Sequence, residues 1–199
     1  MAAARVAVFG GTFDPFHLGH LAVAEQARDG ILADDTWVVP AGVPPLHGPA
    51  LSGAADRLEI CRAAIAGRRG ISVLDLELRR PGPSYTVDTM RDLAAAHPDV
   101  QLWVVLGADA ARQIAAWHGA AELLAGYHFV LVNRAGEALI HHAEAIGLGY
   151  RPERTRVVGI ESPDISATEI RRRAAAGEPL NGLVSPAVAA MIAARGLYR

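Results

Sequence analysis

The chain has 199 residues, enough for one domain of ordinary size, and its composition of 51% hydrophobic and 20% charged residues excludes wholesale disorder. The formal net charge is −2 and all 19 cationic side chains are arginine. A clustered basic face for nucleic acid is therefore not expected, and no lysine is available to bind phosphate. A single cysteine, Cys61, excludes an intrachain disulfide. No run is long enough for a signal segment or a membrane span, so we expect a cytoplasmic protein without a membrane partner.

Short apolar runs alternate with longer helical patterns along the chain. The predicted strands cover residues 5–9, 36–39, 71–78, 101–106, 127–132 and 156–160. The predicted helices cover residues 17–32, 54–66, 85–97, 110–117, 137–146, 166–176 and 187–195. This alternation predicts an α/β fold, a doubly wound, Rossmann-like and mainly parallel sheet with helices on both faces. No repeat or linker divides the chain, so residues 1–199 are expected to form a single domain.

Ligands of such sheets bind beyond the carboxyl ends of strands where the strand order reverses, which directs attention to the turns after the first and fourth strands. The first turn and the following helix start read GGTFDPFHLGH at residues 10–20. Gly10 and Gly11 allow positive φ, and a helix start offers free N–H groups to phosphate. His17 and His20 share one helical face and could donate hydrogen bonds to phosphate oxygens. A plain turn with a surface histidine pair is the alternative, and a zinc site would lack a third ligand at metal spacing.

Two later segments carry polar residues at expected helix starts. Ser166 and Glu169 form the S-x-x-E pattern of a capping box, so a helix should begin there, and Arg171 lies one turn further on. A well-capped helix explains this segment without any ligand, although the arginine could reach an oxyanion. Gly107 and Asp109 follow the fourth predicted strand, where a turn with a helix cap is the simplest interpretation.

Residues 10–20 resemble the G-G-T-F-D-P-x-H-x-G-H signature of the bacterial nicotinate-nucleotide adenylyltransferases, which belong to the nucleotidylyltransferase superfamily with the HxGH motif. Further segments resemble motifs of this family in the family's order, at residues 40–48, 82–89, 107–109 and 165–171. The closing residues 188–198 are also similar to the family's last helix and its L-Y ending. The resemblance implies transfer of the adenylyl group of ATP to nicotinate mononucleotide, a step of NAD biosynthesis that gives deamido-NAD and pyrophosphate.

The resemblance also implies roles for the residues at matching positions. Those expected to be catalytic are His17, His20 and Arg171. Those expected to bind ATP are Gly10, Gly11, Thr12, Phe13, Gly107, Asp109, Ile165, Ser166 and Thr168. Those expected to bind the pyridine mononucleotide are Asp14, His47, Ser84, Tyr85, Thr86, Asp88 and Trp117, although core packing is the commoner fate of a tryptophan. The helices from about residue 164 are expected to complete the ATP site, with Mg²⁺ held mainly by the ATP phosphates and not by protein metal ligands.

The chain departs from the family in the proline-rich loop at residues 40–48. Many relatives read P-P-H-K there, whereas Leu46 takes the histidine position and His47 the lysine position. His47 could replace that cation only when protonated, and an ordinary histidine pKa is about 6.5. The departure puts the acceptor in doubt, so that nicotinamide mononucleotide and 4′-phosphopantetheine stay open as acceptors. A non-catalytic nucleotide sensor is a separate alternative. The sequence also leaves a homo-oligomer open.

Overall fold

The computed structural model describes residues 3–45, 48, 50–134 and 138–199. Six strands form one sheet in the order β3-β2-β1-β4-β5-β6, and every neighbouring pair is parallel. The strand order reverses between β1 and β4, which confirms the predicted doubly wound fold. The strands are β1 (Ala4–Gly11), β2 (Asp35–Pro40), β3 (Ile71–Val73), β4 (Val100–Gly107), β5 (His128–Arg134) and β6 (Thr155–Ile160).

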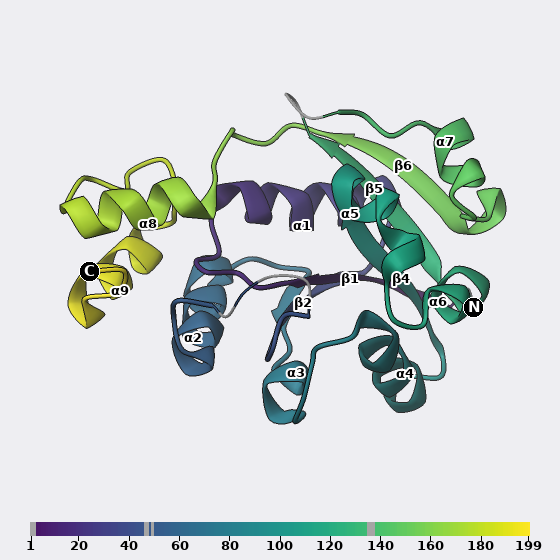
Figure 1. The fold of residues 1–199 in the computed structure, drawn as a ribbon, viewed down its shortest axis with the longest axis horizontal. Coiled ribbons are helices and arrows are strands. Elements are labelled where there is room, and N and C mark those ends of the chain that lie inside the picture. The colour runs from purple at the N-terminus through teal and green to yellow at the C-terminus, as the bar shows by residue number, and fades with distance from the viewer. Residues whose placement is uncertain (1–2, 46–47, 49, 135–137) are drawn as a thin grey trace.

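Helices cover both faces of this sheet. Figure 1 shows α1 and α4 on opposite sides of the central strands. No helix of the described residues is long and apolar enough to cross a membrane. The helices are α1 (Leu18–Gly30), α2 (Ala54–Ile65), α3 (Leu76–Arg79), α4 (Thr86–Ala96), α5 (Ala108–Arg112), α6 (Ala120–Gly126), α7 (His142–Gly147), α8 (Ala167–Ala176) and α9 (Pro186–Arg195), with short 3-10 helices at Ile114–Ala116 and Pro152–Arg154.

The alternation of side chains along each strand divides the core into two faces. Val6 and Val8 of β1 pack in one cluster with residues of α4 and α6, whereas Ala7 packs on the other face with residues of α1. All three side chains are at most 4% exposed. Because both faces are covered, the central strands consist of nearly continuous apolar runs, which is typical of parallel sheets.

A third cluster lies beside the turn that follows β1. Phe13 and Phe16 from this turn pack there with apolar residues of α2, α8 and α9. In Figure 1, α8 and α9 lie together at one end of the molecule, next to the first turn of α1. The C-terminal helices therefore support the segment in which the sequence places the HxGH motif.

The structure corrects several predicted elements. The strand expected at residues 71–78 ends at Val73, and Leu76–Arg79 forms α3. The apolar–charged alternation predicts a strand only if the charged residues face solvent, but Glu77 is 6% exposed and accepts a hydrogen bond from Thr89. The helix expected at residues 110–117 is α5 followed by a 3-10 turn, and α6 was not predicted.

The helix expected at residues 137–146 is shorter than predicted. Residues 138–141 are not helical, α7 spans His142–Gly147, and residue 137 lies outside the described residues. The other predicted helices and strands are present with end shifts of the usual size.

Candidate active site

The turn after β1 is built differently from the sequence prediction. Gly10 and Gly11 are the last residues of β1, paired with β2, and neither has a positive φ; the left-handed residue of the turn is Phe13, with φ 50°. A Cβ on Gly11 would lie 2.7 Å from the Phe13 ring, whereas a Cβ on Gly10 would meet nothing within 4 Å. Gly11 is therefore required for the packing of Phe13, and Gly10 keeps the space beyond the strand end open.

His17 and His20 cap the helix that follows. His17 is the N-cap of α1, and its Nδ1 accepts a hydrogen bond from the backbone N–H of His20 at 3.3 Å. In return, His20 Nδ1 accepts one from the backbone N–H of His17, also at 3.3 Å. This reciprocal pattern is a capping box in which two imidazoles replace the usual hydroxyl and carboxylate. The rings stack with centroids 3.6 Å apart and planes inclined by 19°.

The capping box determines which nitrogen of each ring carries the proton. An Nδ1 that accepts a hydrogen bond is unprotonated, so a neutral imidazole in this position carries its proton on Nε2. Burial, assisted by the positive charge of Arg134, lowers the pKa of His17 to about 4. Burial also lowers the pKa of His20 well below its usual range, with further contributions from His17 and Arg134. Both rings are thus neutral near pH 7, and each has one Nε2–H donor that the cap does not use.

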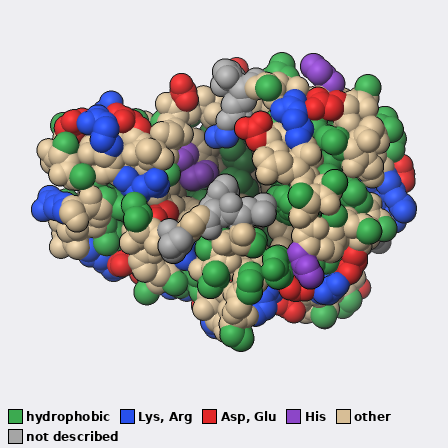
Figure 2. Space-filling model, viewed as in Figure 1, with side chains coloured by type: hydrophobic (Ala, Val, Ile, Leu, Met, Phe, Trp, Pro, Cys, Tyr) green, Lys and Arg blue, Asp and Glu red, His purple; other side chains and the backbone are tan. Residues whose placement is uncertain are grey.

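Two adjoining cavities open at the carboxyl ends of β1 and β4. The larger measures about 600 Å³ and the smaller about 430 Å³. Figure 2 shows histidine side chains beside a hollow in this face of the molecule. The expected site residues that line the larger cavity are Gly10, Gly11, Thr12, Ser84, Tyr85, Thr86, Gly107 and Trp117. Those that line the smaller cavity are Gly10, Gly11, Phe13, His20, Gly107, Asp109 and Trp117.

Four expected acceptor-binding residues, Ser84, Tyr85, Thr86 and Trp117, belong to the wall of the larger cavity. Ser84 is buried, and its Oγ accepts hydrogen bonds from the N–H groups of Gly42 at 2.8 Å and Val43 at 3.3 Å. The Tyr85 ring stacks on His118 with centroids 4.3 Å apart. The Trp117 ring borders both cavities, and its buried Nε1 has no hydrogen-bond partner among the described residues. Flat aromatic surfaces of this kind suit a planar ring.

The expected phosphate-binding residues of α8 line neither cavity. Arg171 Nη1 donates to the backbone carbonyl of Asp14 at 2.7 Å, and Nη2 donates to Thr168 Oγ1 at 3.1 Å. Ser166 caps α8 as predicted, since its Oγ accepts from the N–H of Glu169 at 3.2 Å. The expected capping box is only half formed, because the Glu169 carboxylate bonds to arginines of its own helix. Ile165 lies just before this cap, outside both linings.

Asp14 was expected to contact the acceptor, but its side chain is buried and makes hydrogen bonds within the protein. It is 6% exposed, and its carboxylate accepts hydrogen bonds from Leu51 N at 2.7 Å, Tyr198 Oη at 2.8 Å and Ser52 N at 3.3 Å. Burial alone would raise the pKa of Asp14, but hydrogen bonds from these three residues outweigh it and lower that pKa. Asp14 therefore joins the turn after β1 to two distant segments, and neither cavity includes it.

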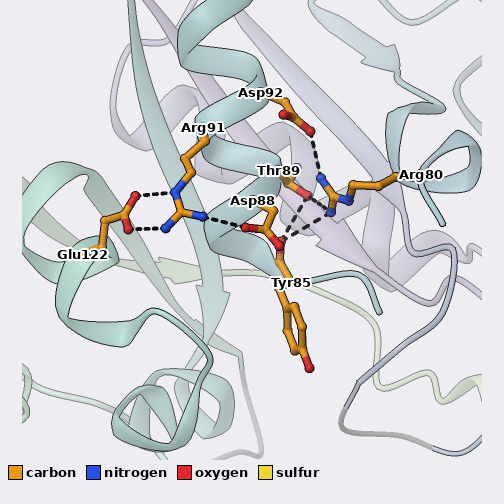
Figure 3. Close-up of polar contacts among 7 residues, drawn as sticks. All are labelled: Arg80, Tyr85, Asp88, Thr89, Arg91, Asp92 and Glu122. Atoms are coloured by element: carbon orange, nitrogen blue, oxygen red, sulfur yellow. Dashed lines mark hydrogen bonds and ion pairs between the residues drawn. The ribbon is translucent and has the colours of Figure 1, made fainter. Parts of the chain in front are cut away.

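Asp88 also lies outside both cavity linings. Its carboxylate accepts a hydrogen bond from Arg91 Nη1 at 2.7 Å on the outer side of α4, where Arg91 also pairs with Glu122 (Figure 3). This arrangement is a solvent-exposed ion-pair network and offers no group to a ligand in the larger cavity. His47, the remaining expected acceptor contact, lies outside the described residues.

Two buried charged residues of the site were missed by the sequence analysis. Arg57 is 1% exposed, and it donates to the carbonyl oxygens of Thr12 at 2.7 Å and Gly42 at 3.3 Å, which ties together two segments of the larger cavity wall. It lies three residues before Ile60 on the buried face of α2, a placement that could have revealed it. Glu77 lines the same cavity, and burial raises its pKa. Its sequence context indicated a strand instead.

The fold and the cavities at its switch point are those of a nucleotide-binding α/β protein, and a family model described as cytidylyltransferase-like matches residues 8–173. A protein of Herpetosiphon aurantiacus named probable nicotinate-nucleotide adenylyltransferase is 39% identical to this chain, in an alignment that covers 98% of both chains. A protein of Roseiflexus sp. with the same name is also 39% identical to it, and that alignment covers 100% of both chains. A Plasmodium falciparum nicotinic acid mononucleotide adenylyltransferase complexed with NaAD superposes with a TM-score of 0.80, at 20% identity over 98% of this chain and 97% of that one. The chain belongs to the nicotinate-nucleotide adenylyltransferase family.

Proposed function

We propose that this protein transfers the adenylyl group of ATP to nicotinate mononucleotide, giving deamido-NAD and pyrophosphate. Membership of the adenylyltransferase family supports the reaction class and the acceptor. The observation that carries the proposal is the reciprocal cap of His17 and His20, which leaves an Nε2–H donor on each of two neutral rings. The His20 ring lines the smaller cavity, and the His17 ring, which lines neither cavity, stacks on it. Two adjoining cavities suit a reaction that joins two nucleotides.

In the proposed reaction, an oxygen of the acceptor's phosphate attacks the α-phosphorus of ATP in line, and pyrophosphate leaves. A phosphate monoester has a second pKa of about 6, so it is already anionic near neutral pH and needs no strong general base. The protein contributes position and charge neutralisation. His17 and His20 donate to oxygens of the reacting phosphates, which suits neutral Nε2–H groups.

We assign ATP to the smaller cavity and the acceptor to the larger one. His20 and Asp109 line the smaller cavity. The Asp109 side chain is 78% exposed and pairs with Arg112 at 3.6 Å, and in this proposal its carboxylate meets the ribose. The larger cavity carries Tyr85 and Trp117, whose rings can face a pyridine. Mg²⁺ would enter on the ATP phosphates, whose oxygens suit this hard cation, and would neutralise part of their charge.

The helices from about residue 164 complete the ATP site in this proposal. Arg171 uses Nη1 and Nη2 for one internal bond each, and a guanidinium has further N–H donors for a phosphate oxygen. The cap at Ser166 orients a helix N-terminus, whose partial positive charge favours an anion. Residues 1–199 then act as one domain. The cytoplasmic location and a homo-oligomer stay predictions.

Pyrophosphate release from ATP and Mg²⁺ tests this function. The acceptors to compare at equal concentration are nicotinate mononucleotide, nicotinamide mononucleotide and 4′-phosphopantetheine. We expect a strong preference for nicotinate mononucleotide, and His20→Ala should abolish the release while the far-UV spectrum stays that of the folded protein. A preference for another acceptor would overturn the assignment of the larger cavity. ATP binding without release of pyrophosphate on any acceptor would indicate a nucleotide sensor.

A further inference from the structure

The segment after α9 reaches the turn after β1 with one side chain. Tyr198 Oη donates a hydrogen bond to Asp14 Oδ1 at 2.8 Å, although the two residues are 184 positions apart in the chain. The Asp14 carboxylate takes its remaining two hydrogen bonds from backbone N–H groups of residues 51 and 52. The tyrosine hydroxyl thus joins this carboxylate to the segment after α9, while residues 51 and 52 hold it from a second segment.

The backbone of Asp14 is tied to the same end of the chain. Its carbonyl oxygen accepts from Arg171 Nη1 of α8 at 2.7 Å. Two residues earlier, the carbonyl oxygen of Thr12 accepts a hydrogen bond from the buried Arg57 of α2 at 2.7 Å. Phe13, between these two carbonyls, has φ 50°, a backbone conformation that costs free energy in residues other than glycine. The turn therefore depends on donors from other elements to hold its shape.

Tyr198 is itself held in place by its surroundings. Its ring packs against the cluster that contains Phe13. The α9 helix is capped at its end by Gly196 in the left-handed conformation, and Arg195 of this helix pairs with Asp56 of α2 at 2.7 Å. Tyr198 has φ 68°, also an unfavourable conformation for a non-glycine residue. A strained residue whose hydroxyl meets a buried carboxylate indicates that the contact stabilises this local conformation.

We propose that Tyr198 is a positioning residue of the active site, which acts through Asp14 to fix the turn that carries the reciprocal histidine cap. Asp14 lies three residues before His17, so a shift of its carboxylate or carbonyl moves the start of α1. The imidazole donors depend on that start, because each Nδ1 is oriented by a backbone N–H of the cap. The inference rests on the proposed adenylyl transfer for its kinetic consequence, but its structural consequence can be measured without any substrate.

The variant Tyr198→Phe removes the hydroxyl and keeps the ring that packs in the cluster. We expect kcat for adenylyl transfer to fall about tenfold, as one poorly oriented donor would cause, with the KM for the acceptor unchanged. The matched control is Ser185→Ala, which removes the N-cap of α9, where Ser185 Oγ accepts from Val188 N. No hydrogen bond joins the Ser185 side chain to Asp14 or to the turn in the described part of the chain. The control should lower the free energy of unfolding and leave kcat as in the wild type.

A double-mutant cycle tests whether the hydroxyl acts through Asp14. The kcat of Asp14→Ala combined with Tyr198→Phe should equal that of Asp14→Ala alone, because position 14 then has no acceptor for the hydroxyl to hold. Multiplicative losses in the double variant would overturn the proposal. So would a wild-type kcat in Tyr198→Phe, or an equal loss of kcat in Ser185→Ala.

The ring nitrogens of His17 and His20 provide a readout without substrate. In the protein alone, ¹⁵N NMR should show the Nδ1 resonances of both rings shifted by Tyr198→Phe and unchanged by Ser185→Ala. Unchanged resonances in Tyr198→Phe would refute the positioning role. If the wild type released no pyrophosphate on any acceptor while these resonances shifted as expected, the proposed reaction would fail and the inference about Tyr198 would stand.

Discussion

Replacing His17 with Asn separates the two tasks of this residue, which are to cap α1 and to offer an Nε2–H donor. The His17 side chain is 4% exposed, and burial is the main reason that its pKa falls from 6.5 to about 4. This lowered pKa means that the unfolded chain binds a proton more readily than the native one. The free energy of unfolding therefore decreases as the pH falls from about 6.5 to about 4, and above about pH 6.5 it has its full value.

The size of the effect follows from the same numbers. The difference between 6.5 and about 4 corresponds to about 3 kcal/mol over the full range, of which about 2 kcal/mol is lost by about pH 5. Asn is among the best N-cap residues, so His17→Asn should unfold with nearly the wild-type free energy near pH 7.5, within about 1 kcal/mol. Because it does not titrate, the variant should then lose about 2 kcal/mol less than the wild type on moving to about pH 5.

Urea unfolding at the two pH values measures this difference, and pyrophosphate release measures the second task. Turnover of His17→Asn should fall at least about 100-fold, the usual effect of removing one donor to a developing charge. The argument that His17 is neutral in the native state would be refuted if His17→Asn lost as much free energy between the two pH values as the wild type. It would also be refuted if the variant kept wild-type turnover, because the amide cannot place an N–H where the imidazole Nε2–H lies.

Further variants test three individual features of the site. Gly11→Ala should lower the free energy of unfolding by about 1–3 kcal/mol, because its Cβ would lie 2.7 Å from the Phe13 ring. In Gly10→Ala the Cβ meets no atom within 4 Å, so this variant should unfold like the wild type and only bind ATP more weakly in calorimetry. Arg57→Met should lower the free energy of unfolding in urea by about 2 kcal/mol, since two partly buried carbonyls lose their donor, and Arg57→Lys should recover part of this loss. A Met variant as stable as the wild type would contradict the bridging role. Asp88→Asn should leave the KM for the acceptor within about twofold, as for other exposed ion pairs, and a rise of about tenfold would restore the acceptor contact that the family resemblance implies.

The fold could be predicted because most of its elements are encoded by residues close together in the sequence. Apolar runs such as that of β4 alternate with amphipathic helices, and a parallel sheet follows from that order. The prediction failed where one residue broke the usual link between charge and exposure. Glu77 is charged and buried, so the pattern around it indicated a strand where α3 forms. The missed helix α6 has Gly119, with φ 69°, as its N-cap. Glycine offers no side-chain cap, so the sequence carries no capping signal for this helix.

The site was predictable where its residues are close in sequence and not where their partners are distant. The spacing of His17 and His20 indicated a shared helical face, but their roles as mutual caps depend on ring orientation, which no spacing reveals. Asp14 belongs to the motif in sequence, yet its partners lie 37, 38 and 184 positions away. Nothing in the residues around Asp14 indicates those contacts, and a match to a motif cannot distinguish a residue that meets the substrate from one that supports the motif.

The tie between Asp14 and the far end of the described chain also has a consequence for the order of events on the ribosome. The turn after β1 leaves the exit tunnel well before its donors Arg171 and Tyr198, which are synthesised 157 and 184 positions after Asp14. β1 also lacks hydrogen bonds along one edge until β4 has been synthesised and pairs with it. Contacts of such separation form late and slow the folding of a chain. A copy that stops before Tyr198 would therefore carry the whole HxGH motif without the contacts that hold its shape, so that nucleotide binding would appear only once Tyr198 has been synthesised.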